Sequence, residues 1–174
     1  MKHLDDDKAI EMIEAILNSD VADCYKYAVS VFACSDGGYC ADDAYEIAAN
    51  IAFCNTSEPI PEIAREFILL AFLDEIENDN DDAMLDLGSL YYTGRIGEQS
   101  YAKAVEYYKM AEAYGNLIAS ENLGYCYYYG RDVEIDYKKA YHCFIKPALA
   151  GRLESLYKIG DMYSKGLYVN QDIS

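Results

Sequence analysis

The chain has 174 residues, enough for one compact domain or a short array of repeats, and 52% of them are hydrophobic. Its formal net charge is −17, and residues 1–82 hold 20 acidic against 4 basic side chains, so no basic patch is available for nucleic-acid phosphates. The longest apolar run, Phe67 to Leu73, is too short to span a bilayer, and no secretory signal opens the chain. We therefore expect a cytoplasmic protein that binds neither nucleic acid nor membrane.

Two helical patterns occupy the first part of the chain. Residues 6–18 carry an apolar stripe at helical spacing, and a second helix is expected from about 21 to 34. The segment Ser35-Asp36-Gly37-Gly38 then breaks the helical pattern. We interpret residues 1–41 as an N-terminal helical cap or a degenerate helix pair, because the end units of repeat arrays face water and diverge.

Residues 42–81 predict a diverged, acidic repeat. The positions that match a later unit at a constant offset of 39 residues are Ala44 with Ala83, Ala49 with Gly88, and Asn55 with Gly94. Asn55 is therefore expected to cap the first helix in the left-handed conformation, which Asn tolerates better than other non-glycine residues. The second helix is expected over residues 62–77, directly after Pro61, since proline suits the start of a helix.

From residue 82 onward the sequence repeats itself with a period of 36 residues. The residues in register include Gly88, Gly124 and Gly160, then Gly94, Gly130 and Gly166, then Tyr91, Tyr127 and Tyr163, and the pair Ala104 and Ala140. A fixed period of this size is typical of arrays in which each unit is one supersecondary element stacked on the next. Such arrays mostly present a surface, so the period favours a binding function.

Each unit reads as two helices joined by a tight loop. In residues 82–116 an apolar stripe predicts the first helix, and Gly94 follows it as a left-handed cap. The N-cap of the second helix recurs as Ser100, Asp136 and Asp172. A glycine inside the first helix, such as Gly88, costs roughly 1 kcal/mol relative to alanine, so its recurrence predicts that another helix crosses closely there.

These units resemble the Sel1-like repeat family, a relative of the tetratricopeptide repeats. The resemblance covers about residues 82–174 and is carried by Leu87-Gly88, Leu90-Tyr91, Gly94, Lys103-Ala104, Tyr107-Tyr108-Lys109, Ala111 and Gly115 in the first unit, by Leu123-Gly124, Tyr127, Gly130, Val133, Asp136, Lys139-Ala140 and Gly151 in the second, and by Ile159-Gly160, Met162-Tyr163, Gly166, Val169 and Asp172 in the third. Pro147 departs from the pattern. Because proline lacks an N–H and crowds the preceding turn, we expect a kink or a shortened second helix there.

The period and the resemblance together predict an all-α fold class, a right-handed α-α superhelix (solenoid) of antiparallel helix pairs with about nine helices. We expect one continuous domain with repeats at 82–116 and 117–152 and a half repeat at 153–174. The last unit is a half repeat because Asp172 should cap a second helix that the sequence does not complete.

No constellation of side chains predicts catalysis, a cofactor or a metal site. The six cysteines, Cys24, Cys34, Cys40, Cys54, Cys126 and Cys143, show neither CxxC spacing nor the 36-residue step, so free thiols are expected. His142 and Cys143 are helix neighbours that point about 100° apart, which disfavours a catalytic dyad or, with Cys126, a zinc site. The acidic clusters lack the EF-hand pattern, and no glycine-rich phosphate loop follows a strand. A hydrolase with paired carboxylates stays open, although nothing selects a pair.

The candidate partner-binding positions are those on the first helices that vary between units. They are Asp86, Ser89, Tyr92, Asn122, Tyr125, Tyr128, Lys158 and Asp161. In tetratricopeptide-like solenoids the first helices line the concave face, so the resemblance implies a groove that contains Tyr92, Tyr125 and Tyr128. Tyrosine suits an interface because it combines a large area with a polar tip. The alternative is that these are ordinary half-exposed tyrosines.

Three functions follow from these observations. The first is a non-enzymatic adaptor or scaffold that binds a protein or peptide in the groove. The second is an acidic protein that neutralises or regulates a basic protein partner through residues 1–82, as an immunity factor does. The third is a structural array that self-associates through the open C-terminal end. We expect the native chain to continue, or a partner or second copy to cover that end.

Overall fold

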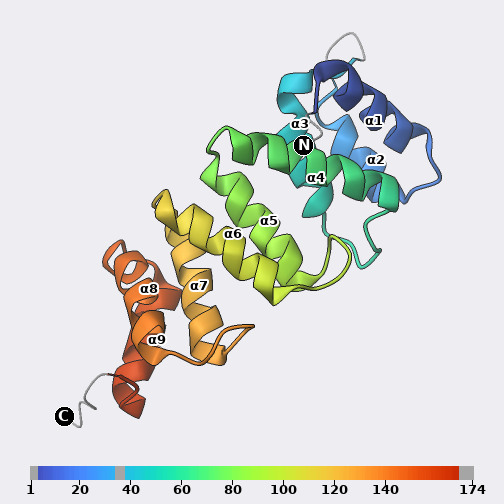
Figure 1. The fold of residues 1–174 in the computed structure, drawn as a ribbon. Helices are drawn as coiled ribbons and strands as arrows, with labels where there is room; N and C mark the ends of the chain where they lie inside the picture. Colours follow the sequence, from blue (N-terminus) through green and yellow to red (C-terminus); the bar gives the residue numbers. More distant parts are fainter. Residues whose placement is uncertain (1–3, 34–37, 169–174) are drawn as a thin grey trace. The chain divides into compact units, whose positions relative to one another are not determined.

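The structure, a computed structural model, describes residues 4–33 and 38–168 (Figure 1). Within these ranges the regular elements are one 3-10 helix and nine α-helices, which confirms the all-α fold class. The helices are α1 (Asp6–Asn18), α2 (Asp23–Ser30), η1 (Ala41–Asp43), α3 (Ala44–Ala52), α4 (Glu62–Glu77), α5 (Asp81–Thr93), α6 (Tyr101–Ala113), α7 (Leu117–Tyr129), α8 (Tyr137–Leu149) and α9 (Leu153–Lys165). None of them is both long and apolar enough to cross a membrane. Cys34, Asp172 and most of the expected break at 35–38 lie outside the described residues.

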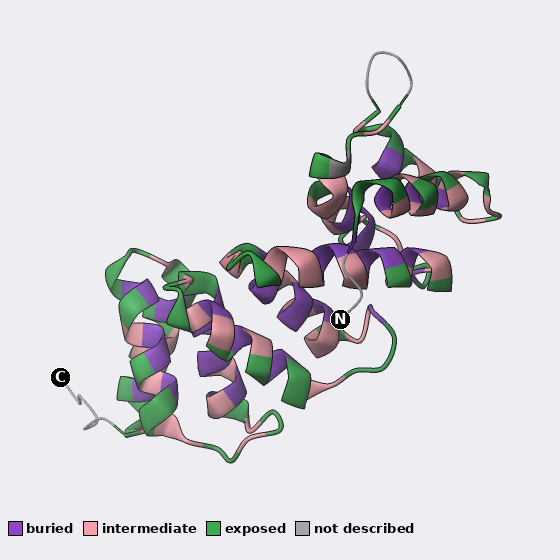
Figure 2. Ribbon diagram, turned by 45° about the horizontal axis from the view of Figure 1, so that its top comes forward, coloured by how far each residue is buried: buried purple, intermediate pink, exposed green. Residues whose placement is uncertain are grey.

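The chain divides into two compact units, Met1–Gln99 and Ser100–Ser174. The boundary lies inside the repeat expected at 82–116. In the first unit α4 is the central helix, because it packs against α1, α3 and α5. Its buried residues are Ala64, Phe67, Ile68, Ala71 and Phe72. They recur at the i, i+3, i+4, i+7 and i+8 positions and so form one broad face of α4 (buried residues are purple in Figure 2).

The end of α3 differs from the sequence prediction. The helix ends at Ala52 with Phe53 as its cap, and Asn55 has no positive φ, so the left-handed cap predicted at Asn55 is wrong. The side chain of Arg95 instead binds carbonyl groups at the end of α3. Its guanidinium donates to the carbonyl oxygens of Ala52 at 3.0 Å, Thr56 at 3.2 Å and Cys54 at 3.4 Å. These bonds satisfy carbonyl groups at and just after the end of α3, where a left-handed cap would have placed backbone N–H donors.

The second unit consists of α6 to α9, in which α7 packs against both α6 and α8, and α8 packs against α9. Ala104 of α6 and Ala140 of α8 are fully buried, as the repeat predicts for small residues on the second helices. The core around α8 contains Tyr128, Ala140, Phe144 and Met162. Half-buried tyrosines pack against it: Tyr125, Tyr127, Tyr137 and Tyr141.

The repeated caps have the geometry that the period predicts. Gly94, Gly130 and Gly166 follow α5, α7 and α9 in the left-handed conformation, with φ of 75°, 69° and 64°. The side chains of Ser100 and Asp136 accept the N–H groups of Lys103 and Lys139 at the starts of α6 and α8. The sequence reading missed a further pair of N-caps, Asn80 of α5 and Asn116 of α7, whose side chains each accept two backbone N–H groups.

The glycines inside the first helices are not equivalent. A Cβ on Gly124 would lie 2.8 Å from the Phe144 ring, so α8 crosses α7 closely at this point, as predicted. Gly88 is buried in α5. At Gly160 the prediction of a close crossing is wrong, because no atom lies within 4 Å of the Cβ position. The close crossing at Gly124 depends on the Phe144 ring, and no described residue takes the corresponding place beside Gly160.

Pro147 does not shorten its helix. It is buried inside α8, which has 13 residues, the same length as α6. Proline has no N–H to donate to the carbonyl group of Cys143, four residues earlier. The Ser120 hydroxyl of α7 donates to that carbonyl oxygen at 2.9 Å, in a buried position. A bond from the neighbouring helix therefore replaces the missing bond within α8 and makes proline tolerable.

Candidate protein-interaction surface

The predicted groove residues lie on the first helices and are divided between the two units. Asp86, Ser89 and Tyr92 belong to α5 in the first unit. Those of the second unit are Asn122, Tyr125 and Tyr128 on α7 and Lys158 and Asp161 on α9.

In the second unit, α9 brings Lys158 to the tyrosines of α7. The Nζ atom of Lys158 lies 4.5 Å from the ring centroid of Tyr128, 5.1 Å from that of Tyr129 and 5.6 Å from that of Tyr125. It also donates a hydrogen bond of 2.9 Å to the Tyr129 hydroxyl. An ammonium group over aromatic faces is attracted by the ring quadrupole. Of the predicted residues, Tyr125, Tyr128 and Lys158 therefore do come together, and Tyr129 joins them although the sequence reading did not select it.

Tyr128 belongs to the core of this unit. Its side chain is 8% exposed, and its hydroxyl donates to a carboxylate oxygen of Asp161 at 2.7 Å. Burial and the Asp161 bond raise the pKa of Tyr128. Lys165 donates to the same carboxylate at 3.0 Å, and this bond, followed by that from Tyr128, holds the pKa of Asp161 below its usual value. Tyr128 and Asp161, both predicted groove residues, thus form a hydrogen bond between α7 and α9.

Tyr125 and Tyr129 form the outer part of the cluster. The Tyr125 ring meets Phe144 edge-on with centroids 5.1 Å apart, and it stacks on Tyr129 at 6.3 Å. Tyr125 is half-buried and Tyr129 is exposed. Together with half-buried Lys158 they form a surface of two aromatic rings and an ammonium group, which we call the α7–α9 tyrosine surface.

In the first unit, Asp86 contacts a different helix. Its carboxylate accepts a hydrogen bond of 3.1 Å from the Tyr45 hydroxyl of α3. Burial raises the pKa of Asp86 to about 6, against the lowering effect of the Tyr45 bond. Ser89 donates to the Leu85 carbonyl oxygen within α5, and the Tyr92 carbonyl oxygen accepts from Gln99. The side chains of Ser89 and Tyr92 are half-buried.

Glu121 forms an ion pair that the sequence reading missed. Its side chain is 6% exposed and lies 2.8 Å from the Arg152 guanidinium, and Ser155 of α9 also donates to it. Burial favours the neutral acid, but the bonds from Arg152 and Ser155 outweigh it and lower the pKa of Glu121. The sequence does contain a sign of this pair at the N-cap positions of the first helices, which are 36 residues apart. Two of these positions hold asparagine, Asn80 and Asn116, and the third holds Arg152. Arg152 makes no side-chain cap and contacts Glu121 instead.

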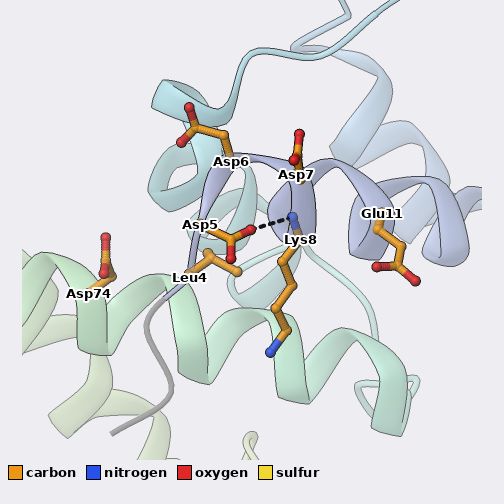
Figure 3. A pocket seen from close by; sticks show the side chains of 7 residues that line it. All are labelled: Leu4, Asp5, Asp6, Asp7, Lys8, Glu11 and Asp74. Atoms are coloured by element: carbon orange, nitrogen blue, oxygen red, sulfur yellow. Dashed lines mark hydrogen bonds between the residues drawn. The ribbon is translucent and has the colours of Figure 1, made fainter.

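The first unit also has an acidic cavity of about 850 Å³. Figure 3 shows the side chains that line it, Leu4, Asp5, Asp6, Asp7, Lys8, Glu11 and Asp74. They come from the start of α1 and from α4, and Asp5 accepts the backbone N–H of Lys8 as the N-cap of α1. A smaller cavity of about 190 Å³ shares Leu4, Asp6 and Asp74 and adds Asp42 and Glu75. Carboxylates from several segments thus surround one region of this unit.

The thiols of the second unit are poorly suited to nucleophilic chemistry. Burial raises the pKa of Cys126 to about 11 and that of Cys143 to about 12, so both are protonated at neutral pH. The His142 ring lies beside the rings of Tyr141 and Tyr168. Across residues 4–33 and 38–168, no three His, Cys, Asp or Glu side chains are arranged to hold a metal ion.

The fold has solved structural relatives. A Sel1 repeat protein from Oxalobacter formigenes superposes with a TM-score of 0.54 at 28% identity, covering 60% of this chain and 78% of its own. A protective antigen of uropathogenic Escherichia coli strains, with an SLR fold, superposes with a TM-score of 0.61 at 18% identity. That match covers 95% of this chain, which spans 43% of the length of the antigen. Both likenesses support a helical-repeat solenoid fold class.

No curated protein matches the chain significantly. The Sel1 repeat family model matches residues 81–115, 118–151 and 153–174, which together make up more than half of the sequence. These segments contain the periodic glycines and correspond to helices α5 to α9. The chain therefore belongs to the Sel1 repeat family.

Proposed function

We propose that this protein is a non-enzymatic adaptor or scaffold that holds a protein or peptide partner on the first helices of its repeats. Sel1 repeats generally serve as protein–protein interaction modules. The proposal places the protein in the cytoplasm, where its half-buried and exposed thiols, such as Cys54 and Cys40, stay reduced.

The observation that carries this proposal is the α7–α9 tyrosine surface. Tyr125, Tyr129 and Lys158 offer apolar area, hydroxyl groups and a positive charge at one place. Tyrosines are enriched in interfaces because two side-chain torsions order a large area at a small entropic cost. The rings are already held by Phe144 and by Lys158, so a partner meets an ordered surface.

The test is capture of partners from the source cells, identification by mass spectrometry, and direct binding of the purified partner to variants. Tyr125→Ala and Lys158→Ala should each weaken binding by roughly 1–2 kcal/mol, about a fivefold to thirtyfold loss of affinity. Tyr92→Ala tests the α5 positions in the same assay. Tyr128→Ala is unsuitable, because the loss of a core ring confounds binding with folding.

Tyr114→Ala provides the matched control, since this exposed tyrosine is the C-cap of α6 and is not part of the α7–α9 tyrosine surface. Circular dichroism must show that all variants keep their helical content. Affinity that stays unchanged in Tyr125→Ala, Lys158→Ala and Tyr92→Ala would remove the basis of the proposal.

A second candidate function is the binding of a basic protein partner by the first unit. The acidic cavity favours it, because Asp6, Asp7 and Glu11 of α1 and Asp74 of α4 line the same space. A focused negative potential attracts a basic surface and raises the association rate.

This function predicts binding that weakens with salt. The double variant Asp7→Asn with Glu11→Gln should slow association, with the loss greatest at low ionic strength, while Asp5 is kept because it caps α1. Glu106→Gln with Glu134→Gln removes the same charge from the second unit and serves as the control. Equal effects of the two pairs would count against a role of the cavity.

A further inference from the structure

Helix α9 has an exposed apolar face in the second unit. Leu153 is 76% exposed and Tyr157 is 72% exposed, one turn apart. Gly160 and Ser164 continue this line along the helix and are exposed as well. We call these four residues the α9 face. Two large side chains on one half of the face are thus followed by two small residues on the other half.

The preceding repeat shows how such a face is normally covered. The counterparts of Tyr157, Gly160 and Ser164, one period earlier, are Glu121, Gly124 and Tyr128, and all three are buried. In α7, Phe144 of α8 covers Gly124. Arg152, the N-cap residue of α9, covers Glu121, and Asp161 of α9 covers Tyr128. At the position where α7 has Glu121 in a buried ion pair, α9 therefore has the exposed ring of Tyr157.

Gly160 is the clearest sign of an unused packing position. A Cβ on Gly124 would lie within 3.0 Å of three atoms of the Phe144 ring, whereas a Cβ on Gly160 would have nothing within 4 Å. A glycine inside an exposed helix costs roughly 1 kcal/mol relative to alanine. A second element that packs closely against the helix at that point would offset this cost.

We propose that a second copy of this chain covers the α9 face, through an antiparallel contact between the two α9 helices about a two-fold axis between Ile159 and Gly160. In this arrangement Tyr157 lies over the partner's Gly160 and the partner's Ser164. A two-fold contact repeats every interaction, so the partner's Tyr157 lies over Gly160 and Ser164 in the same way. The large half of each face meets the small half of the other.

The charges beside the face fit the same axis. Two antiparallel helices related by this axis place the same side of each helix next to each other. A residue on that side lies opposite the partner residue that is equally far from the axis along the helix. Glu154 and Lys165, both exposed, are such a pair, and Lys165 also donates to Asp161 of its own chain. Each Glu154 therefore lies opposite the partner's Lys165, and the two unlike-charge pairs flank the apolar contact. On the other flank, Leu156 lies opposite the partner's Tyr163, and both are exposed in the single chain.

This inference does not depend on the proposed partner-binding function, because the α9 face does not include Tyr125 or Tyr129. It is tested with the purified chain alone, by sedimentation equilibrium from low to high micromolar concentration. The expected result is a monomer–dimer equilibrium. Gly160→Gln should raise the dimer dissociation constant by at least about tenfold, because the new side chain fills the space that Tyr157 requires.

Gly160→Gln separates association from folding. Since the space around Gly160 is empty in the single chain, the variant should keep its helical content and unfold at the same or a higher temperature. A chain that sediments as a monomer at every concentration, or a dimer that Gly160→Gln leaves unchanged, would overturn the proposal.

The orientation is tested by charge reversal. Glu154→Lys and Lys165→Glu should each weaken self-association, because each change places like charges opposite each other at two points. An equimolar mixture of the two variants should form a heterodimer, in which both flanking pairs again carry unlike charges. Glu134→Lys and Lys146→Glu, exposed and outside α9, are the matched controls and should show no such complementation. A mixture that associates no better than its components would exclude the antiparallel contact.

Discussion

At the scale of single residues, each unit contains a partly or fully buried carboxyl group, and the pKa values of the two groups are shifted in opposite directions. Glu121 is paired with Arg152 and Ser155, which lower its pKa, whereas Asp86 receives one hydroxyl bond and has a raised pKa. The difference lies in the charge of the neighbours. A guanidinium group replaces the water that a buried carboxylate loses, and a phenol does so only in part.

Asp86→Asn is predicted to stabilise the first unit at neutral pH and above. With a folded pKa of about 6 against an ordinary 3.8, Asp86 stabilises the fold at low pH, and this contribution is lost as the pH rises through 6. Asparagine keeps an acceptor for Tyr45 without the buried charge. We expect a gain of roughly 1 kcal/mol at pH 8, allowing for the exposed part of the side chain, and no gain near pH 4. Urea denaturation at the two pH values measures it, and a gain that is equal at both would contradict the assignment.

Glu121→Gln is predicted to show the opposite pH dependence. The lowered pKa of Glu121 means that its ion pair stabilises the fold above the ordinary pKa of 4.5 and is lost as the pH falls through the folded value. The variant leaves the Arg152 charge without its partner, so we expect a loss of about 1–3 kcal/mol at pH 7. The loss should shrink below pH 4.5. A constant difference across the pH range would show that the charge of Glu121 is irrelevant.

At the scale of the helix pair, close approach depends on what lies opposite each glycine. Gly124→Ala should destabilise the second unit by roughly 1–3 kcal/mol, because the Phe144 ring would have to move. Gly160→Ala should stabilise it by up to about 1 kcal/mol, because nothing opposes the new methyl group and alanine favours the helix. Thermal unfolding at low protein concentration compares the two. Similar effects of the two substitutions would mean that Phe144 does not restrict position 124.

The comparison of Gly124 with Gly160 shows which features the 36-residue period can predict. It located the caps at Gly94, Gly130 and Gly166 and the N-caps at Ser100 and Asp136, because cap geometry depends on a few residues near the helix end. It failed at Gly160, where packing depends on a residue in another helix. The 39-residue offset likewise failed at Asn55, since Arg95, which is distant in the sequence, satisfies carbonyl groups at the end of α3. Local chemistry repeats with the sequence, whereas a contact requires both partners.

The candidate surface illustrates the same limit. The variable positions on the first helices include Tyr125, Tyr128 and Lys158, which lie together in the structure, and their role in partner binding stays a prediction. Spacing could not show that Tyr128 turns into the core and bonds to Asp161, because that depends on how α9 packs on α7. Nor could it select the Glu121–Arg152 pair, whose residues occupy different positions in the repeat.

At the scale of the whole molecule, the charge follows the division into two units. Residues 1–99 hold 22 acidic and 5 basic side chains, which accounts for the entire net charge of −17, while residues 100–174 hold 9 of each. Like charges that are confined to one compact unit repel one another and oppose its folding. Salt screens this repulsion over distances beyond about 10 Å at 0.1 M ionic strength. The two units should therefore respond differently to ionic strength.

We predict that raising the salt concentration stabilises the first unit selectively. Hydrogen exchange followed by mass spectrometry resolves the helices, so the amides of α1 and α4 can be compared with those of α7 and α8 in one sample. Protection in α1 and α4 should rise severalfold between low and moderate sodium chloride, because screening lowers the free energy of the folded acidic unit relative to its expanded states. Protection in α7 and α8 should change little, since that unit is neutral as a whole and salt weakens pairs such as Lys165–Asp161. Replacing sodium chloride with sucrose is the control for effects unrelated to charge, because sucrose strengthens burial in both units alike. An equal response of the two units to salt would show that the net charge of residues 1–99 does not limit their stability.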